Sequence, residues 1–258
     1  MEKPSNIGWS YSCAIALNNN AVSLLSKGHL NEAMETFADG IQVLRNANED
    51  PCAHREAEAR QKVHKADQML SESQFKKASH PGCEGVEVKV ITEDDIAESV
   101  RNIVHDAINS SQTLKLFLIR IELIPKNEVE IQKHMGGLIA ALLLNNFGNA
   151  YISAAIIETD SHRALDLWEA AYRLFQLACS NLVAISSKNF KIEYDELTVR
   201  LFPLSVIILQ NLDRISTVLG FLPDARTYHS TMIDVLESFI KMDALYRTFA
   251  GQAAAAAA

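Results

Sequence analysis

The sequence contains few of the residues that interrupt secondary structure. Only six prolines and ten glycines occur among its 258 residues. A fold made of many short strands needs frequent turns, which proline and glycine usually supply. The apolar fraction of 48% is too high for a disordered chain. We therefore expect a globular, mainly α-helical protein with long helices.

The chain is also poor in clustered positive charge and in cysteine. Its formal net charge is −8, and the longest basic cluster is the pair Lys76–Lys77, so we expect no nucleic-acid partner. The four cysteines form no C-x-x-C motif. We interpret them as free thiols of an intracellular, reducing compartment, cytoplasmic or organellar, in preference to a disulfide framework. The first ten residues show no basic region followed by an apolar run, so no secretory signal is expected there.

One stretch of the sequence lacks charge altogether. Residues 135–157 contain no Asp, Glu, Lys or Arg and are long enough to cross a bilayer. However, Asn145, Asn146 and Asn149 lie near the middle, and unpaired amides are costly in hydrocarbon. We expect a helix buried among other helices and no membrane span.

Apolar periodicity and turn residues predict the order of elements along the chain. Gly28 is expected to adopt the left-handed conformation that ends a first helix, and Pro203 to kink a later helix or mark its start. Alternating valines predict a strand at 85–91, and branched residues predict a second strand at 113–125, with a helix between them. The two strands are expected to pair and to close one side of the helical body. The predicted helices are two within 14–45, then 53–72, 128–158, 161–187, 194–219 and 223–248.

Three segments of the chain resemble one another. Each begins with a leucine followed by Asn or Gln and then Asn; they start at Leu17, Leu144 and Leu209. Each is followed by a small residue and a larger one four positions later, in a second helix. These sets are Ala21, Ala33 and Phe37; Gly148, Ala164, Trp168 and Ala171, in a unit that is one helical turn longer; and Asp213, Ala225 and His229.

Two of these segments carry a family resemblance. "GHLNEAMETFADG" (28–40) and "FGNAY" (147–151) resemble the tetratricopeptide repeat (TPR), a helix-turn-helix unit. The whole chain is also similar to a diatom-type group of TPR proteins, a resemblance that implies a fold and no activity. The TPR resemblance implies an α-solenoid whose first helices line a concave groove. The spacing between the three units is irregular, so we do not expect a regular tandem array.

With this resemblance, the chain divides into four parts. Residues 1–80 are expected to form a TPR-like unit with a polar helix and a linker, and 81–125 a strand-helix-strand insert. Residues 126–250 are expected to form the long-helix TPR-like units. Residues 251–258 end in six alanines, and we treat them as a non-native or placeholder tail.

The amides of the three segments are the candidate binding residues. A side-chain amide offers an acceptor and donors, so it can pair with both polar groups of an extended backbone. The alternative is a structural role, in which the amides fix the spacing of neighbouring helices. A clamp for a terminal carboxylate is not expected, because Val22 stands where that arrangement would need an asparagine. The candidates are Asn18, Asn19, Val22, Asn145, Asn146, Asn149, Gln210, Asn211 and Arg214.

The sequence carries no motif for reaction chemistry. Phosphate-binding glycine loops, H-E-x-x-H and G-x-S-x-G are absent from it, and His80 with Cys83 lacks a second pair for zinc. We therefore expect no catalytic residues, metal or cofactor, and a non-enzymatic scaffold. It would bind an extended protein or peptide segment in a concave helical groove, or serve as an architectural subunit of a larger complex. The alternative is an enzyme or metal-dependent factor with a site between the 81–125 insert and the helices.

Overall fold

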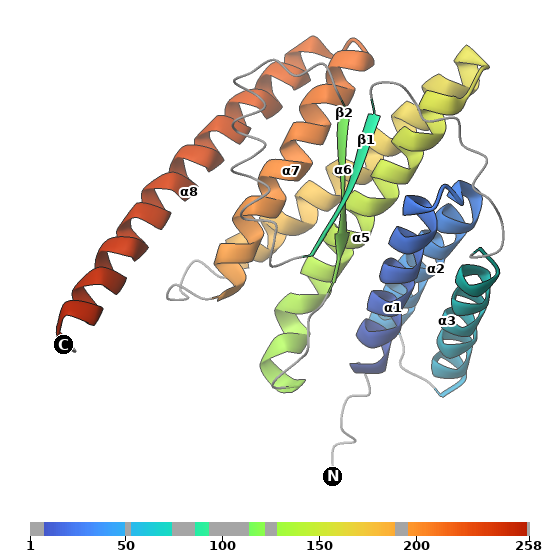
Figure 1. Ribbon diagram of the computed structural model, residues 1–258, viewed down its shortest axis with the longest axis horizontal. Coiled ribbons are helices and arrows are strands. Elements are labelled where there is room, and N and C mark those ends of the chain that lie inside the picture. The colour runs from blue at the N-terminus through green and yellow to red at the C-terminus, as the bar shows by residue number, and fades with distance from the viewer. Residues whose placement is uncertain are drawn as a thin grey trace.

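The protein is mainly α-helical with a small two-stranded parallel sheet, as the composition predicted (Figure 1). The computed structural model describes residues 8–49, 53–73, 86–92, 114–121, 128–188 and 196–256. The predicted helix between the strands lies outside these residues. The described elements are α1 (Gly8–Ser26), α2 (Leu30–Glu49), α3 (Ala53–Ser73), β1 (Val86–Thr92), β2 (Leu114–Arg120), α5 (Glu128–Ile157), α6 (Ser161–Lys188), α7 (Glu196–Val218) and α8 (Leu222–Ala256).

Among the described residues, two of the three helix hairpins (α1–α2, α5–α6 and α7–α8) turn at a left-handed glycine. Gly28 follows α1 with φ of 82°, as predicted, and Gly220 follows α7 with φ of 77°. In both turns the next residue donates its N–H to a carbonyl five positions earlier, His29 to Leu24 at 2.9 Å and Phe221 to Ser216 at 2.7 Å. This hydrogen bond satisfies a carbonyl that the ending helix leaves without a partner.

The α5–α6 hairpin turns by side-chain capping instead. Oδ1 of Asp160 accepts the N–H groups of His162 at 2.9 Å and Arg163 at 3.3 Å. These are first-turn donors of α6 that lack a helical partner. Pro203 lies inside α7, which begins at Glu196, so it does not mark the start of that helix.

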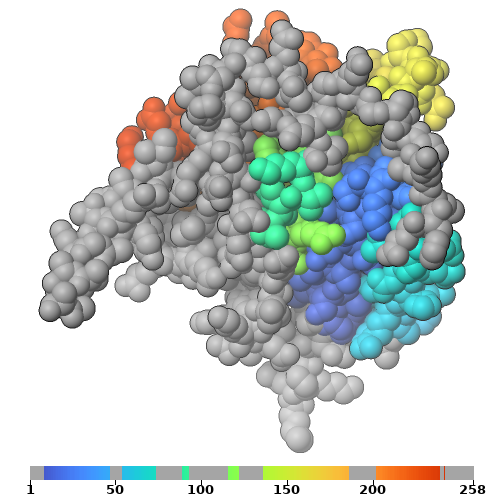
Figure 2. Space-filling view, viewed as in Figure 1, coloured from blue at the N-terminus to red at the C-terminus, as the bar shows by residue number. Residues whose placement is uncertain are grey.

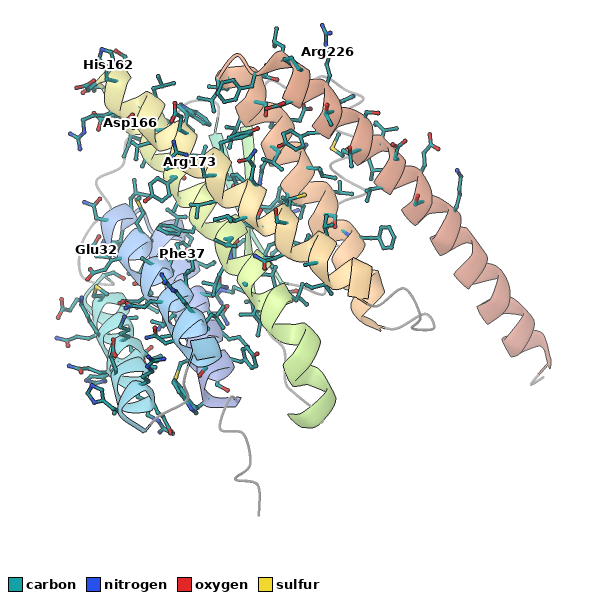
Figure 3. The ribbon with its side chains drawn as sticks, turned by 180° about the vertical axis from the view of Figure 1, so that it is seen from behind. Glu32, Phe37, His162, Asp166, Arg173 and Arg226 are labelled. Atoms are coloured by element: carbon teal, nitrogen blue, oxygen red, sulfur yellow. The ribbon has the colours of Figure 1, made fainter. Side chains whose placement is uncertain are left out.

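The hairpins pack in chain order. α1 packs against α2 and α3, α2 against α5, α5 against α6, α6 against α7, and α7 against α8. The first helices α1 and α5 contact the strands, which cross the near side of the helices in Figure 1. Viewed from behind, α2 and α6 lie in front of these first helices, and Phe37 is seen on α2 (Figure 3).

The two strands pair in parallel, with Val86 opposite Leu114 and Thr92 opposite Arg120. Every described side chain of residues 116–121 except Arg120 is buried. β1 is more peripheral: Lys89 and Val90 are exposed, and β1 reaches the surface beside α1 (Figure 2). β2 is therefore the inner strand, between β1 and the helices.

The uncharged stretch forms most of α5. Residues Gly136–Ile157 are long and apolar enough for a membrane span by length and composition alone, and 67% of an 18-residue apolar segment within them is buried inside the molecule. α5 contacts α1, α2, α6, α7 and β2. A helix covered on several sides needs apolar residues around most of its circumference, which accounts for the composition without a bilayer.

The packing corrects one part of the repeat alignment. A Cβ on Gly148 would lie 2.7 Å from the ring of Phe175, so the bare glycine allows α6 to approach α5. Ala171 and Phe175 are both fully buried, whereas Ala164 and Trp168 are only partly buried. The side chain that faces Gly148 is therefore Phe175, seven residues after Trp168.

Candidate functional site

Five of the predicted amides gather around β2. Asn18 and Asn19 come from α1, and Asn145, Asn146 and Asn149 come from α5; we call these five residues the amide cluster. All of them except the half-buried Asn19 have no exposed surface. Positions four apart lie on the same face of a helix, whereas adjacent positions are about 100° apart around its axis, so Asn146 flanks the face that Asn145 and Asn149 share.

Two amides each bind both the backbone N–H and the backbone C=O of a single residue, one within β2 and one directly after it. Asn146 donates from Nδ2 to the C=O of Ile119 at 2.7 Å and accepts the N–H of Ile119 at 2.9 Å. Asn19 makes the same pair of bonds with Ile121, both at 2.9 Å. The side-chain amide has the donor and acceptor arrangement of a peptide group, so it substitutes for a neighbouring strand.

At the third contact, the amides bind only the backbone C=O of the strand residue. Asn149 donates to the C=O of Phe117 at 2.9 Å, and Asn145 donates to the same oxygen at 3.4 Å. Oδ1 of Asn149 is buried and has no hydrogen-bond partner among the described residues. The amide cluster thus binds the backbone of Phe117, Ile119 and Ile121. These are alternate residues, so their backbone N–H and C=O groups point to the same edge of the strand.

The amides also bind one another. Asn146 donates to Oδ1 of Asn18 at 2.9 Å, and Asn18 donates to the C=O of Ile119 at 3.0 Å. Asn211 of α7 donates to Oδ1 of Asn145 at 3.3 Å. The network therefore joins three helices to the strand, and each link satisfies a polar group that burial would otherwise leave unpaired.

The remaining candidates lie around this network. Val22 and Gln210 are buried, and Arg214 is partly buried. Asn20 faces elsewhere and donates to Oδ1 of Asp67 on α3 at 2.7 Å. The three consecutive asparagines thus form hydrogen bonds on two faces of α1. Asn18 and Asn19 bond the strand backbone, and Asn20 bonds α3.

The position predicted for an outside segment is occupied by the chain itself. The sequence predicts that the amides hold an extended backbone, and here that backbone is β2 together with Ile121. It did not identify residues 117–121 as the segment held. The available signal was the predicted strand at 113–125, the second of the two strands expected to close one side of the helical body.

Burial disfavours the charged form of three ionisable groups at the helix contacts. Partial burial raises the pKa of the Cys13 and Cys179 thiols, both of which are free. Burial also raises the pKa of Tyr172, and its hydrogen bonds with Tyr228 and Asp224 add to this effect. Tyr172 donates to Oδ2 of Asp224 at 3.0 Å, which ties α6 to α8. These groups stabilise helix contacts and show no activation as nucleophiles.

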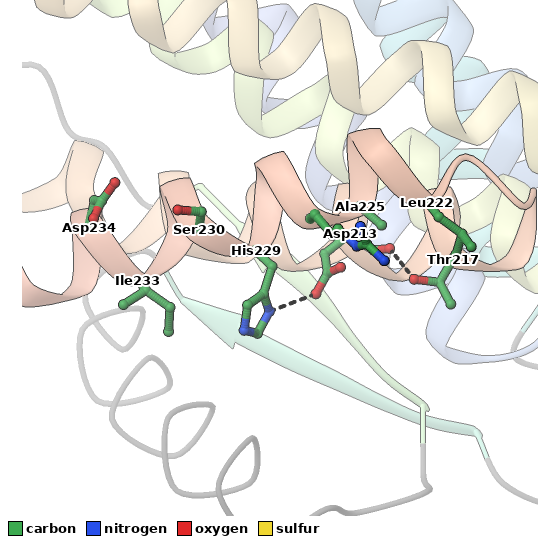
Figure 4. A pocket seen from close by; sticks show the side chains of 9 residues that line it. Asp213, Thr217, Leu222, Ala225, His229, Ser230, Ile233 and Asp234 are labelled. Carbon is green, nitrogen blue, oxygen red and sulfur yellow. Dashed lines mark hydrogen bonds and ion pairs between the residues drawn. The ribbon is translucent and has the colours of Figure 1, made fainter.

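A second candidate site is an open groove between α7 and α8, which we call the end groove (Figure 4). Its volume is about 540 Å³. Nδ1 of His229 lies 3.1 Å from Oδ2 of Asp213 across it. In the sequence, both residues stand out only as repeat positions. The groove is lined by Asp213, Thr217, Leu222, Ala225, Arg226, His229, Ser230, Ile233 and Asp234.

Among the described residues, no group of three or more His, Cys, Asp or Glu side chains is placed to hold a metal ion. The His80 and Cys83 pair lies outside those residues. Comparison of the chain with protein-family models, with curated proteins and with solved structures gives no match.

Proposed function

We propose that the protein is a non-enzymatic scaffold that binds other proteins and is built from TPR-like helix hairpins. The observation that carries this proposal is the packing order of the helices. The first helix of each later hairpin packs against the second helix of the hairpin before it, α5 on α2 and α7 on α6. Stacks of this kind present long surfaces to partners without needing catalytic groups.

The contacts between hairpins support the same interpretation. Small residues occur where helices approach closely: Gly148 faces Phe175, and a Cβ on Gly40 would lie 3.1 Å from Leu143. The rings of Phe37 and Phe147 lie 6.0 Å apart between α2 and α5. An aromatic residue thus fills the space between consecutive hairpins, as repeat packing requires.

Within this proposal, the amide cluster has a structural role. An outside segment could take the place of β2 only if the strand left the core. Five side chains that are at most 3% exposed would then lose their burial: Leu116, Phe117, Leu118, Ile119 and Ile121. At about 2 kcal/mol each, the cost is on the order of 10 kcal/mol. This is comparable to the whole net stability of a domain, so we place partner binding on the outer surfaces.

The proposal is tested by isolating the protein from cells that express it naturally. Native-size fractionation with chemical cross-linking should show the chain in an assembly that contains a different protein in a fixed ratio. Cross-links should map to exposed lysines on the outer helices, such as Lys65 on α3 and Lys241 on α8. Recovery of the chain without any different protein in a fixed ratio would contradict the scaffold assignment. Metal analysis of the purified chain tests the alternative of a metal-dependent factor.

A further inference from the structure

We propose that the end groove binds α8 of a second copy of this chain, so that the protein forms a two-fold symmetric dimer. This inference goes beyond the proposed function, because it names a partner that the scaffold assignment does not require. The molecule contains another groove of this kind, between α1 and α2, that is already filled by a helix.

The first hairpin shows what such a groove holds. α5 packs against both α1 and α2. Phe147 of α5 contacts Phe37, and Leu143 approaches Gly40. Residue numbers fall along α5 as they rise along α2, so the helix seated in this groove runs antiparallel to α2.

The end groove occupies the equivalent place in the last hairpin. Ala21, Ala33 and Phe37 have the same spacing as Asp213, Ala225 and His229. By this register, Leu222 and Ile233 of α8 correspond to Leu30 and Ile41 of α2. The equivalence predicts that a helix antiparallel to α8 fits the end groove.

The equivalent side chains differ sharply in exposure. Leu30 and Phe37 are 8% and 0% exposed, whereas Leu222, at the position of Leu30, is 53% exposed. Ile41 is partly buried, and Ile233 at the equivalent position is 41% exposed. His229, at the position of Phe37, has 58% of its side chain exposed. Two large apolar side chains on a concave surface are a favourable contact for another helix.

The charged residues that line the end groove favour a second copy of this chain as its occupant. Arg226 and Asp234 both line the groove and lie four residues before and after Ser230. If α8 of a second copy lies antiparallel with the two-fold axis at Ser230, Arg226 of each copy faces Asp234 of the other. The surface is therefore complementary to itself, as a two-fold interface requires. Head-to-tail stacking is disfavoured, because α3 already covers α1 at the other end.

The test is light scattering on the purified full-length chain with charge-exchange variants. The wild-type mass should be twice the 28.6 kDa of one chain. Arg226→Asp alone and Asp234→Arg alone should each weaken self-association by about tenfold, since each creates two like-charge contacts per dimer. An equimolar mixture of the two variants should recover a dimer, because each unlike pair then restores both attractions.

A pair of matched variants distinguishes loss of contact in the end groove from a general effect of adding charge to α8. Ile233→Asp should give a monomer with the helical circular dichroism of the wild type. Thr231→Asp, on an exposed part of α8 that does not line the groove, should leave the dimer intact. A wild-type chain that stays monomeric at high micromolar concentration overturns the proposal, as does a dimer that Ile233→Asp and the charge variants leave unchanged.

These outcomes are distinct from those of the scaffold test. A monomeric chain that is isolated with a different protein in a fixed ratio refutes the dimer and leaves the scaffold assignment in place. A dimer that is isolated without any different protein supports this inference and contradicts the scaffold assignment.

Discussion

At the scale of single residues, the amide cluster explains why asparagine is placed inside helices. Asparagine is a poor helix former, so its presence there costs some helix stability. The cost is offset because Asn146 and Asn19 satisfy backbone groups of Ile119 in β2 and of Ile121 just after it, and both residues are buried. No apolar residue can take their place without leaving those groups unpaired.

Replacement of Asn146 tests this directly. Asn146→Ala leaves the N–H of Ile119 and Oδ1 of Asn18 without their partner, so we expect a loss of about 2–4 kcal/mol in the free energy of unfolding. Urea unfolding measures the change. Asn181→Ala is the control, since Asn181 bonds the C=O of Leu177 within its own helix. Its loss should stay below about 0.5 kcal/mol. Equal effects of the two changes would refute a special role for Asn146.

The two described thiols give a pH-dependent prediction. Burial raises the pKa of Cys13 and Cys179, so both should react with a thiol reagent more slowly than a free cysteine at neutral pH. The folded chain disfavours the thiolate. The stability from the neutral thiols is therefore complete below the unfolded pKa of about 8.5 and is lost as pH rises through the folded pKa. Reaction as fast as with denatured protein at neutral pH would contradict this.

At the scale of elements, the sequence predicted where the helices begin and end but not which elements pack against each other. Long apolar periodicity placed α5 and α6 within one residue of their observed ends, and Gly28 identified the first turn. Periodicity reports which side of a helix is buried and not what covers it. It therefore could not reveal that β2 lies against the amides, or that Phe175 packs on Gly148 in place of Trp168.

The glycine turns supply a prediction at this scale. Gly220 has φ of 77°, and a Cβ there would meet no atom within 4 Å, so a substitution affects the backbone conformation alone. Gly220→Ala should destabilise the chain by about 1 kcal/mol, and Gly220→Asn by less, because asparagine tolerates left-handed backbone. Thermal unfolding of the two variants measures the order. An alanine variant as stable as the wild type would exclude a strained turn.

At the scale of the whole molecule, β2 joins parts that the sequence divided into separate segments. The strand belongs to the 81–125 insert, while the amides that hold it come from the N-terminal hairpin and from α5. Their packing makes the fold one cooperative unit across these boundaries. We therefore expect a single unfolding transition that is the same by circular dichroism and by tryptophan fluorescence.

The most direct test of this account is backbone hydrogen exchange at Ile119 and Ile121. Their N–H groups donate to Asn146 and Asn19, so they should exchange only when the whole domain unfolds. In Asn146→Ala, the protection of Ile119 should fall by more than the loss of global stability alone explains. If both amides exchange quickly in the wild-type chain, β2 is not held by the amide cluster and the account is wrong.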